Sequence, residues 1–139
     1  MPAVFVDSVA WIALLNSSDS LHAQAQQVLA DLRRQSTPLL TTDFVLLEVA
    51  DALSAPAFRD HTVRFIDSLR EQPIVRIIPA SEGLLAAGWS LYSNRSDKEW
   101  SLTDCISFAT MTAEGVTDAF TSDHHFEQAG FRCLLRATA

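Results

Sequence analysis

Residues 4–15 read VFVDSVAWIALL, a short strand pattern that passes directly into a helical one. The three residues at 4–6 are β-branched or aromatic, which is typical of a buried strand. The strand ends at an acid, Asp7, and a short helix is predicted over residues 8–15. A strand that leads directly into a helix begins a βα unit, from which parallel sheets are built.

The same alternation continues along the chain. Apolar runs predict further strands at 38–41, 74–78, 119–121 and 131–135. Helical spacing and terminal signals predict helices at 20–34, 44–53, 56–70, 81–92, 102–114 and 124–129. Because strands alternate with helices, we expect an α/β fold. We expect a three-layer α/β/α sandwich with a mostly parallel central sheet of four to five strands.

Three helix ends carry specific predictions. Ser20 is expected to cap the helix at 20–34 and Asp43 the helix at 44–53, because their side-chain oxygens can accept hydrogen bonds from free helical N–H groups. Gly115 is expected to end the helix at 102–114, since glycine adopts the left-handed conformation that ends many helices.

Length and charge limit the possible functions. A chain of 139 residues predicts one domain, residues 1–139, and 48% hydrophobic against 19% charged residues is a globular composition. The net charge of −7 argues against binding of nucleic acid by the whole surface through charge alone. A nuclease is still possible, because bound divalent cations and a local basic patch can reverse the potential at a site.

The cysteines and the first residues exclude other classes. Cys105 and Cys133 form no CxxC pair and have apolar neighbours, so we interpret both as buried thiols. The apolar stretch at 1–16 lacks a basic flank and is interrupted by an acid. It is therefore expected to be neither a signal peptide nor a membrane span, and we expect a cytoplasmic protein.

Acids stand where the predicted strands end. Asp7 and Asp123 each follow a strand, and a third strand ends near Asp43, whose helix also carries Glu48. Asp104 lies at the start of another predicted helix. The carboxyl ends of parallel strands meet at one edge of a sheet, and ligands bind there in open α/β folds. We therefore expect these acids to converge.

Each acid also has a simpler interpretation. Asp7 and Asp123 could cap the helices that follow them, and the helix dipole could favour Asp104 in a first turn. Glu48 lies between two apolar residues on a helix, where an ionised carboxylate is costly unless it pairs with a buried arginine or a metal. Other acids are interpreted as a cap (Asp43) or as solvated (Asp51 and Asp97).

Several acids at one edge repel each other, and their natural partner is a hard divalent cation with oxygen ligands, Mg²⁺ or Mn²⁺. Such a site suits phosphodiester hydrolysis through metal-activated water, without a side-chain nucleophile. The sequence contains no GxSxG motif, P-loop or zinc-ligand spacing that would support another chemistry.

Neighbouring polar residues are secondary candidates. Thr121 and Ser122 could position a carboxylate or a water, and Ser8 is a further supporting candidate. His124 and His125 directly follow Asp123 and could be metal ligands. Adjacent residues at a helix start diverge, however, and hard-metal carboxylate sites rarely need imidazole, so we interpret both as capping and packing groups.

The polar stretch at 93–100 is the clearest exposed loop in the sequence. It carries two cations that could contact RNA phosphates or could simply be solvated, Arg95 and Lys98. The tryptophans are expected in the core or at an interface: Trp11, Trp89 and Trp100.

Four segments resemble the PIN-domain ribonuclease family, close to the VapC-type toxins of bacterial toxin–antitoxin pairs and their stand-alone relatives. They are VFVDSVAWIALLN (4–16), LLTTDFVLLEVADAL (39–53), WSLTDCISFATM (100–111) and AFTSDHHFEQAGF (119–131). The resemblance covers nearly the whole chain. It implies a single PIN-like nuclease domain whose metal-binding and catalytic acids are Asp7, Glu48, Asp104 and Asp123.

The resemblance also implies a small cytoplasmic endoribonuclease that uses Mg²⁺ or Mn²⁺ and acts on RNA. It implies a homodimer and a small antitoxin that blocks the site in part with a basic residue. The main alternative is a PIN-like scaffold that binds RNA or protein without significant cleavage. The intact set of four acids argues against that alternative.

Two other α/β classes fit the sequence poorly. A receiver-type phosphoacceptor needs a lysine at a late strand end, but Lys98 lies in a polar loop. A haloacid-dehalogenase-type phosphatase needs DxD at the first strand, where this chain has Asp7-Ser8-Val9.

Overall fold

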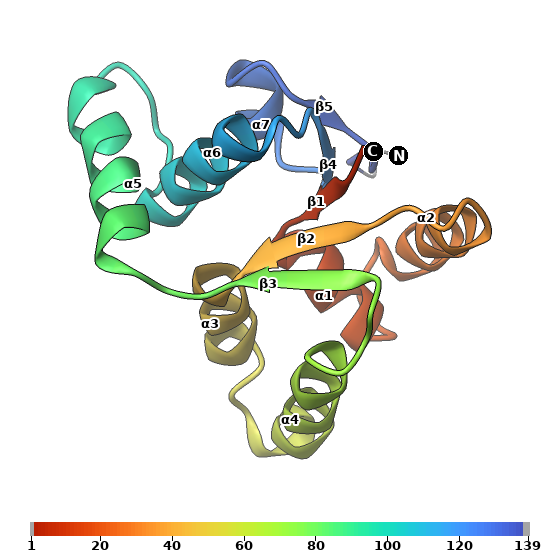
Figure 1. The fold of residues 1–139 in the computed structure, drawn as a ribbon. Coiled ribbons are helices and arrows are strands. Elements are labelled where there is room, and N and C mark those ends of the chain that lie inside the picture. Colours follow the sequence, from red (N-terminus) through yellow and green to blue (C-terminus); the bar gives the residue numbers. More distant parts are fainter. Residues whose placement is uncertain (1, 138–139) are drawn as a thin grey trace.

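The computed structural model describes residues 2–137 and contains a five-stranded sheet in the order β3-β2-β1-β4-β5 (Figure 1). All pairings between neighbouring strands are parallel. The strands are β1 (Val4–Val6), β2 (Leu39–Thr42), β3 (Val75–Ile78), β4 (Asp118–Phe120) and β5 (Arg132–Cys133). The predicted parallel sheet is confirmed.

Helices cover both faces of the sheet (Figure 1). One layer consists of α1 (Ser8–Leu15), α2 (His22–Arg34), α3 (Asp43–Ala52) and α4 (Pro56–Leu69). The other consists of α5 (Glu82–Asn94), α6 (Leu102–Glu114) and α7 (His124–Gln128). The chain changes face after β3, because the next strand, β4, lies on the other side of β1. Within residues 2–137, none of the helices is long and apolar enough to cross a membrane.

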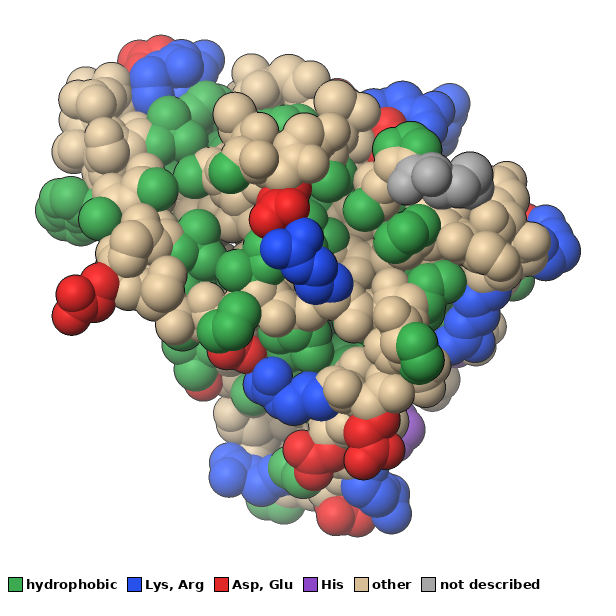
Figure 2. Space-filling view, viewed as in Figure 1, with side chains coloured by type: hydrophobic (Ala, Val, Ile, Leu, Met, Phe, Trp, Pro, Cys, Tyr) green, Lys and Arg blue, Asp and Glu red, His purple; other side chains and the backbone are tan. Residues whose placement is uncertain are grey.

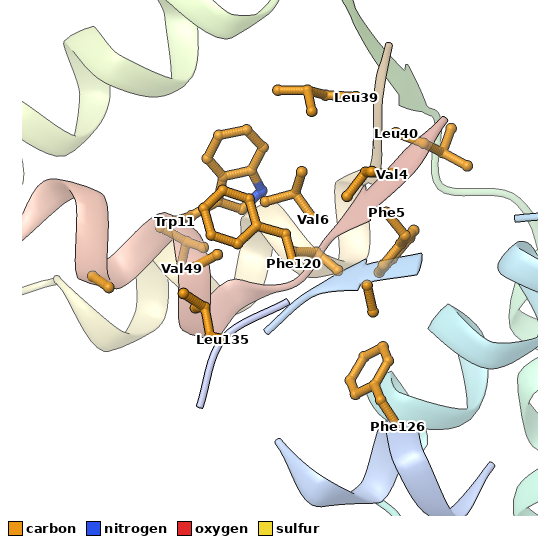
Figure 3. Packing of buried hydrophobic residues seen from close by; sticks show 14 of the residues in the cluster. Val4, Phe5, Val6, Trp11, Leu39, Leu40, Val49, Phe120, Phe126 and Leu135 are labelled. Atoms are coloured by element: carbon orange, nitrogen blue, oxygen red, sulfur yellow. The ribbon is translucent and has the colours of Figure 1, made fainter. Parts of the chain in front are cut away.

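The central strand β1 divides the core into two parts. Side chains alternate between the faces of a strand, so Phe5 points away from its two valine neighbours. Phe5 packs against Phe126 of α7, with ring centroids 6.4 Å apart. Figure 3 shows Trp11 and Val49 on the opposite side of the sheet from Phe126. Each face of the sheet therefore has its own apolar layer.

Two predicted caps are wrong. The helix α2 begins at His22 with no side-chain cap from Ser20, and Asp19 instead accepts a hydrogen bond from the Leu21 N–H. At α3 the cap is Thr42, whose hydroxyl accepts a hydrogen bond from an N–H of the first turn. Asp43 is already helical, because β2 runs one residue further than predicted and its last threonine supplies the cap.

Other predictions have mixed outcomes. Gly115 ends α6 in the left-handed conformation, with φ of 67°, as predicted. Cys105 is buried, whereas Cys133 is only partly buried. Of the three tryptophans that were predicted in the core or at an interface, Trp11 and Trp100 lie in the core, whereas Trp89 is 57% exposed on α5 and its place at an interface stays a prediction.

Gly88 sets how closely α5 approaches α6. A β-carbon at this position would lie 2.2 Å from Ile106 Cγ1 and 3.0 Å from Ile106 Cα. We therefore expect Gly88→Ala to lower the free energy of unfolding by about 1–3 kcal/mol, since overpacking forces the two helices apart. Gly83→Ala is the matched control, because a β-carbon there meets nothing within 4 Å. Urea unfolding should separate the two variants, and equal stabilities would contradict the close approach.

Candidate functional site

The edge of the sheet beyond β1 and β4 carries Asp7, Thr121 and Asp123. Asp7 directly follows β1 and is only 3% exposed. The Thr121 hydroxyl donates a hydrogen bond of 2.9 Å to Asp7 Oδ2 and accepts one of 3.1 Å from the Asp123 N–H. This one side chain therefore connects two acids that are far apart in the sequence, which agrees with its predicted positioning role.

Glu48 comes from the layer of helices α1–α4 and lies near the same acids. It lies on α3, which contacts both α1 and α6. Burial raises the pKa of Glu48, hydrogen bonding to the Ser8 side chain lowers it, and the charges of Asp104 and Asp123 raise it. Glu48 is therefore close enough to Asp104 and Asp123 to respond to their charges, and Ser8 is its hydrogen-bond partner.

Asp104 is held in the first turn of α6. It forms a capping box with Ser101: Asp104 Oδ2 accepts from the Ser101 N–H at 3.2 Å, and the Asp104 N–H donates to Ser101 Oγ at 3.0 Å. The side chain is mostly buried, and burial followed by the charge of Asp123 raises its pKa. The first-turn interpretation is therefore correct, and it leaves the carboxylate facing other acids.

The capping alternatives differ in outcome for the two strand-end acids. Asp123 caps α7, with Oδ1 accepting from the His125 N–H at 2.9 Å. Asp7 stands at the cap position of α1 but makes no side-chain capping bond. A carboxylate has about four lone-pair positions, so one capping bond does not prevent Asp123 from binding a cation.

The electrostatics are unusual at Asp7. Burial raises its pKa to about 7, and the charges of Glu48 and Asp104 act in the same direction, although hydrogen bonds from Ser8 and Thr121 partly offset them. Burial disfavours the charged form of any carboxyl group, and like charges add to the effect. Perturbed acids of this kind concentrate at functional sites.

The four acids have no arginine or lysine partner among residues 2–137. The suggested pairing of Glu48 with a buried arginine is therefore not found. The three acids that were expected to lie outside the site have arginine partners or are exposed to solvent. Asp43 pairs with Arg70 at 3.0 Å and Asp97 with Arg95 at 3.0 Å, while Asp51 is exposed.

The histidine after the last acid, His125, is closer to the site than its sequence position predicts. His125 Nδ1 lies 3.0 Å from Asp123 Oδ1 and 3.5 Å from Asp104 Oδ2, and the side chain is 21% exposed. His124 is 70% exposed and 4.0 Å from Asp123. Asp123, His124 and His125 are also the group of three potential metal ligands that the described residues bring within 4.8 Å.

The remaining candidates from the sequence are Arg95, Lys98 and Ser122. The guanidinium of Arg95 binds both oxygens of Asp97 and lies 5.0 Å from the Trp100 ring, and Lys98 is 3.8 Å from the same aspartate. Both cations are thus engaged within their own loop. Ser122 is partly buried beside Asp123.

The donor set fits a hard divalent cation. Carboxylate oxygens are the ligands that Mg²⁺ and Mn²⁺ prefer, and among residues 2–137 the only basic side chains paired with these acids are the histidines His124 and His125. The four acids are not as tightly grouped as the 4.8 Å set above. That wider spacing leaves room for waters between the carboxylates and a bound cation.

An all-parallel α/β/α sandwich with carboxylates gathered beyond the carboxyl ends of its strands is an architecture that nucleases use. The chain belongs to the PIN domain family, a nuclease family whose model matches residues 4–132. This assignment confirms the family resemblance and the prediction of an enzyme.

Individual relatives are similar over most of their length. The chain is 28% identical over 128 residues to the 23S rRNA-specific endonuclease VapC20 of Mycobacterium tuberculosis, and the match covers 92% of this chain and 95% of the relative. The crystal structure of that VapC20, described as a Sarcin-Ricin loop cleaving toxin, aligns with a TM-score of 0.81 and covers 93% and 96% of the two chains.

Two more distant structures share the fold alone. FitAcB from Neisseria gonorrhoeae has a TM-score of 0.67 at 17% identity, covering 94% of this chain and 95% of that one. VapBC2 from Rickettsia felis, bound to a promoter DNA fragment, has a TM-score of 0.69 at 13% identity, covering 94% and 96%.

Proposed function

We propose that the chain is a divalent-metal-dependent endoribonuclease, a single PIN-like domain that acts as the toxin of a toxin–antitoxin pair. The observation that carries the proposal is the set of buried and partly buried acids that, among residues 2–137, have no arginine or lysine partner. In the proposal, Asp7, Glu48, Asp104 and Asp123 hold Mg²⁺ or Mn²⁺ through their oxygens.

The chemistry follows from that donor set. A divalent cation held there would make a water more acidic and would neutralise charge on the phosphate oxygens of the substrate. The chain's own residues fix the carboxylates in place. Thr121 orients Asp7, and Ser101 orients Asp104. Holding these groups before the substrate arrives reduces the reorganisation needed in the reaction.

Ribosomal RNA is the first substrate to test, because relatives at 28% identity are named 23S rRNA-specific endonucleases. The face in Figure 2 shows acidic and basic side chains intermixed rather than one basic tract. A net charge of −7 likewise gives little general attraction for RNA. Substrate choice would therefore depend on the shape of the RNA near the site, with Arg95 and Lys98 as candidate phosphate contacts.

The proposal includes two protein partners. A homodimer is supported by large apolar side chains that remain exposed on α3 and α5, including Leu47 at 60% and Trp89 at 57%. Figure 2 shows hydrophobic side chains along α5. An antitoxin is supported by the structural relatives that are complexes of the VapBC type.

The test is cleavage of 23S rRNA transcripts by the purified protein. We expect cleavage with millimolar Mg²⁺ or Mn²⁺, loss of cleavage with excess EDTA, and recovery when metal is restored, because the acids alone cannot activate a water. Transcripts that contain and lack the sarcin-ricin loop would show whether the relatives' target is shared.

The control for contaminating nuclease is Asp104→Asn prepared in parallel, with its fold checked by circular dichroism. A folded variant as active as the wild type would overturn the assignment. Binding of RNA by the wild type without any metal-dependent cleavage would instead support the scaffold alternative.

A further inference from the structure

The His125 imidazole lies between two carboxylates that come from different elements. Its Nδ1 is 3.0 Å from Asp123 Oδ1, at the start of α7, and 3.5 Å from Asp104 Oδ2, in the first turn of α6. The ring is mostly buried, in contrast to that of His124, which is 70% exposed. Nδ1 of His125 thus lies beside two carboxylate oxygens of the proposed metal site.

The local backbone fixes this arrangement. Asp123 Oδ1 caps the His125 N–H at 2.9 Å, and Thr121 Oγ1 accepts from the Asp123 N–H at 3.1 Å. The next residue, Phe126, is fully buried against Phe5 and Phe108. The first turn of α7 is therefore anchored on both sides of His125, which limits the positions that the ring can take.

The distances from His125 Nδ1 to the two carboxylate oxygens fit neighbouring corners of one coordination shell. Metal–nitrogen and metal–oxygen bonds of about 2.1 Å at right angles place neighbouring ligand atoms about 3.0 Å apart. The two measured separations, 3.0 and 3.5 Å, lie close to this value. A single Nδ1–H could donate one good hydrogen bond and would leave the second oxygen poorly served, whereas an unprotonated Nδ1 could bind a cation held beside these carboxylates.

We propose that His125 Nδ1 is an additional metal ligand, which binds the cation together with Asp104 and Asp123. This inference rests on the proposed function and extends its metal site beyond carboxylates. Imidazole binds first-row transition ions and is a poor ligand for Mg²⁺, which takes oxygen donors. His125 therefore makes the site prefer Mn²⁺ over Mg²⁺, and the working cation of this chain is a transition metal.

The experiment measures Mn²⁺ binding directly, without RNA. Electron paramagnetic resonance gives the affinity, and pulsed measurements on bound Mn²⁺ report any directly coordinated nitrogen. We expect histidine nitrogen coupling in the wild type, and its change when the protein is labelled with ¹⁵N-histidine. His125→Ala should abolish the coupling and weaken Mn²⁺ binding by about tenfold or more, while Mg²⁺ affinity, measured by competition, changes much less.

His61→Ala is the matched control, because His61 is exposed on α4 and lies outside the group of potential metal ligands, and it should retain both the coupling and the Mn²⁺ affinity. The labelled wild-type protein keeps the test decisive even if His125→Ala folds poorly. Bound Mn²⁺ without nitrogen coupling would overturn the ligand role, and so would an equal loss of Mg²⁺ and Mn²⁺ affinity in the variant. Absence of any Mn²⁺ binding by the wild type would instead overturn the metal site of the proposed function itself.

Discussion

Asp7→Asn is expected to abolish RNA cleavage and, at the same time, to make the metal-free protein more stable at pH 8. Asparagine keeps the size of the side chain and one oxygen for the Thr121 hydroxyl, but it removes a buried charge. The loss of a charged ligand should lower kcat/KM by at least about 100-fold, an effect of the size seen when other enzymes lose one electrostatic group.

The gain in stability follows from the pKa of Asp7. Burial raises this pKa from 3.8 to about 7, so at pH 8 the folded, metal-free protein must hold an ionised carboxylate in an unfavourable place. A tenfold change in proton affinity between the folded and unfolded states corresponds to about 1.4 kcal/mol. The raised pKa therefore sets an upper limit of about 4 kcal/mol on the stabilisation by asparagine.

Asp51→Asn is the matched control, because Asp51 is an exposed acid on α3 and the substitution changes the net charge equally. It should leave both cleavage and stability nearly unchanged. Initial cleavage rates and urea unfolding in EDTA at pH 8 provide the two measurements. An active Asp7→Asn protein, or one that is less stable than the wild type in EDTA, would contradict the role given to Asp7.

The sequence was informative where the chemistry depends on the order of elements. Asp7 and Asp123 could be placed together because parallel strands end at a common edge, whatever their separation in the chain. Glu48 could be singled out because a carboxylate among apolar helix residues needs a partner. The structure brings these acids into one electrostatic group, in which Glu48 responds to both Asp104 and Asp123.

The sequence was less informative where the outcome depends on side-chain direction. Residues at a helix start diverge from each other, and nothing in Asp123-His124-His125 indicates which ring turns inward until α7 is packed against α6. The caps failed for a related reason. One extra residue in β2 gives the capping role to Thr42 and moves Asp43 to its pairing with Arg70.

The pattern of apolar residues also could not show which faces remain open. Leu85, Trp89 and Tyr92 have helical spacing consistent with a buried stripe, yet all three are exposed on α5. The close contact of Gly88 with Ile106 explains this outcome, because α5 packs on α6 at Gly88, its one buried residue, and its larger side chains point away from that contact.

Divalent metal is expected to raise the melting temperature strongly at pH 8 and weakly at pH 5. The folded-state pKa values of Asp7, Glu48 and Asp104 are all raised, so the folded protein binds more protons than the unfolded chain between about pH 4 and 7. The metal-free protein therefore loses stability as the pH rises through this range. Metal binding reverses the trend, because the carboxylates must be ionised to act as ligands.

Calorimetry with EDTA and with millimolar Mn²⁺, at pH values from 5 to 8, measures both effects. A metal concentration 100 times the dissociation constant adds about 2.7 kcal/mol, which amounts to several degrees in the melting temperature of a domain of this size. Asp97 and Asp118 do not contribute to this trend, since hydrogen bonds from Arg95 and Arg132 lower their pKa values instead of raising them. A metal-induced rise of equal size at pH 5 and pH 8 would mean that the cation binds away from the buried acids. If the site is formed as described, the rise in melting temperature grows with pH, and Asp7→Asn removes most of that growth because the group with the pKa of about 7 is gone.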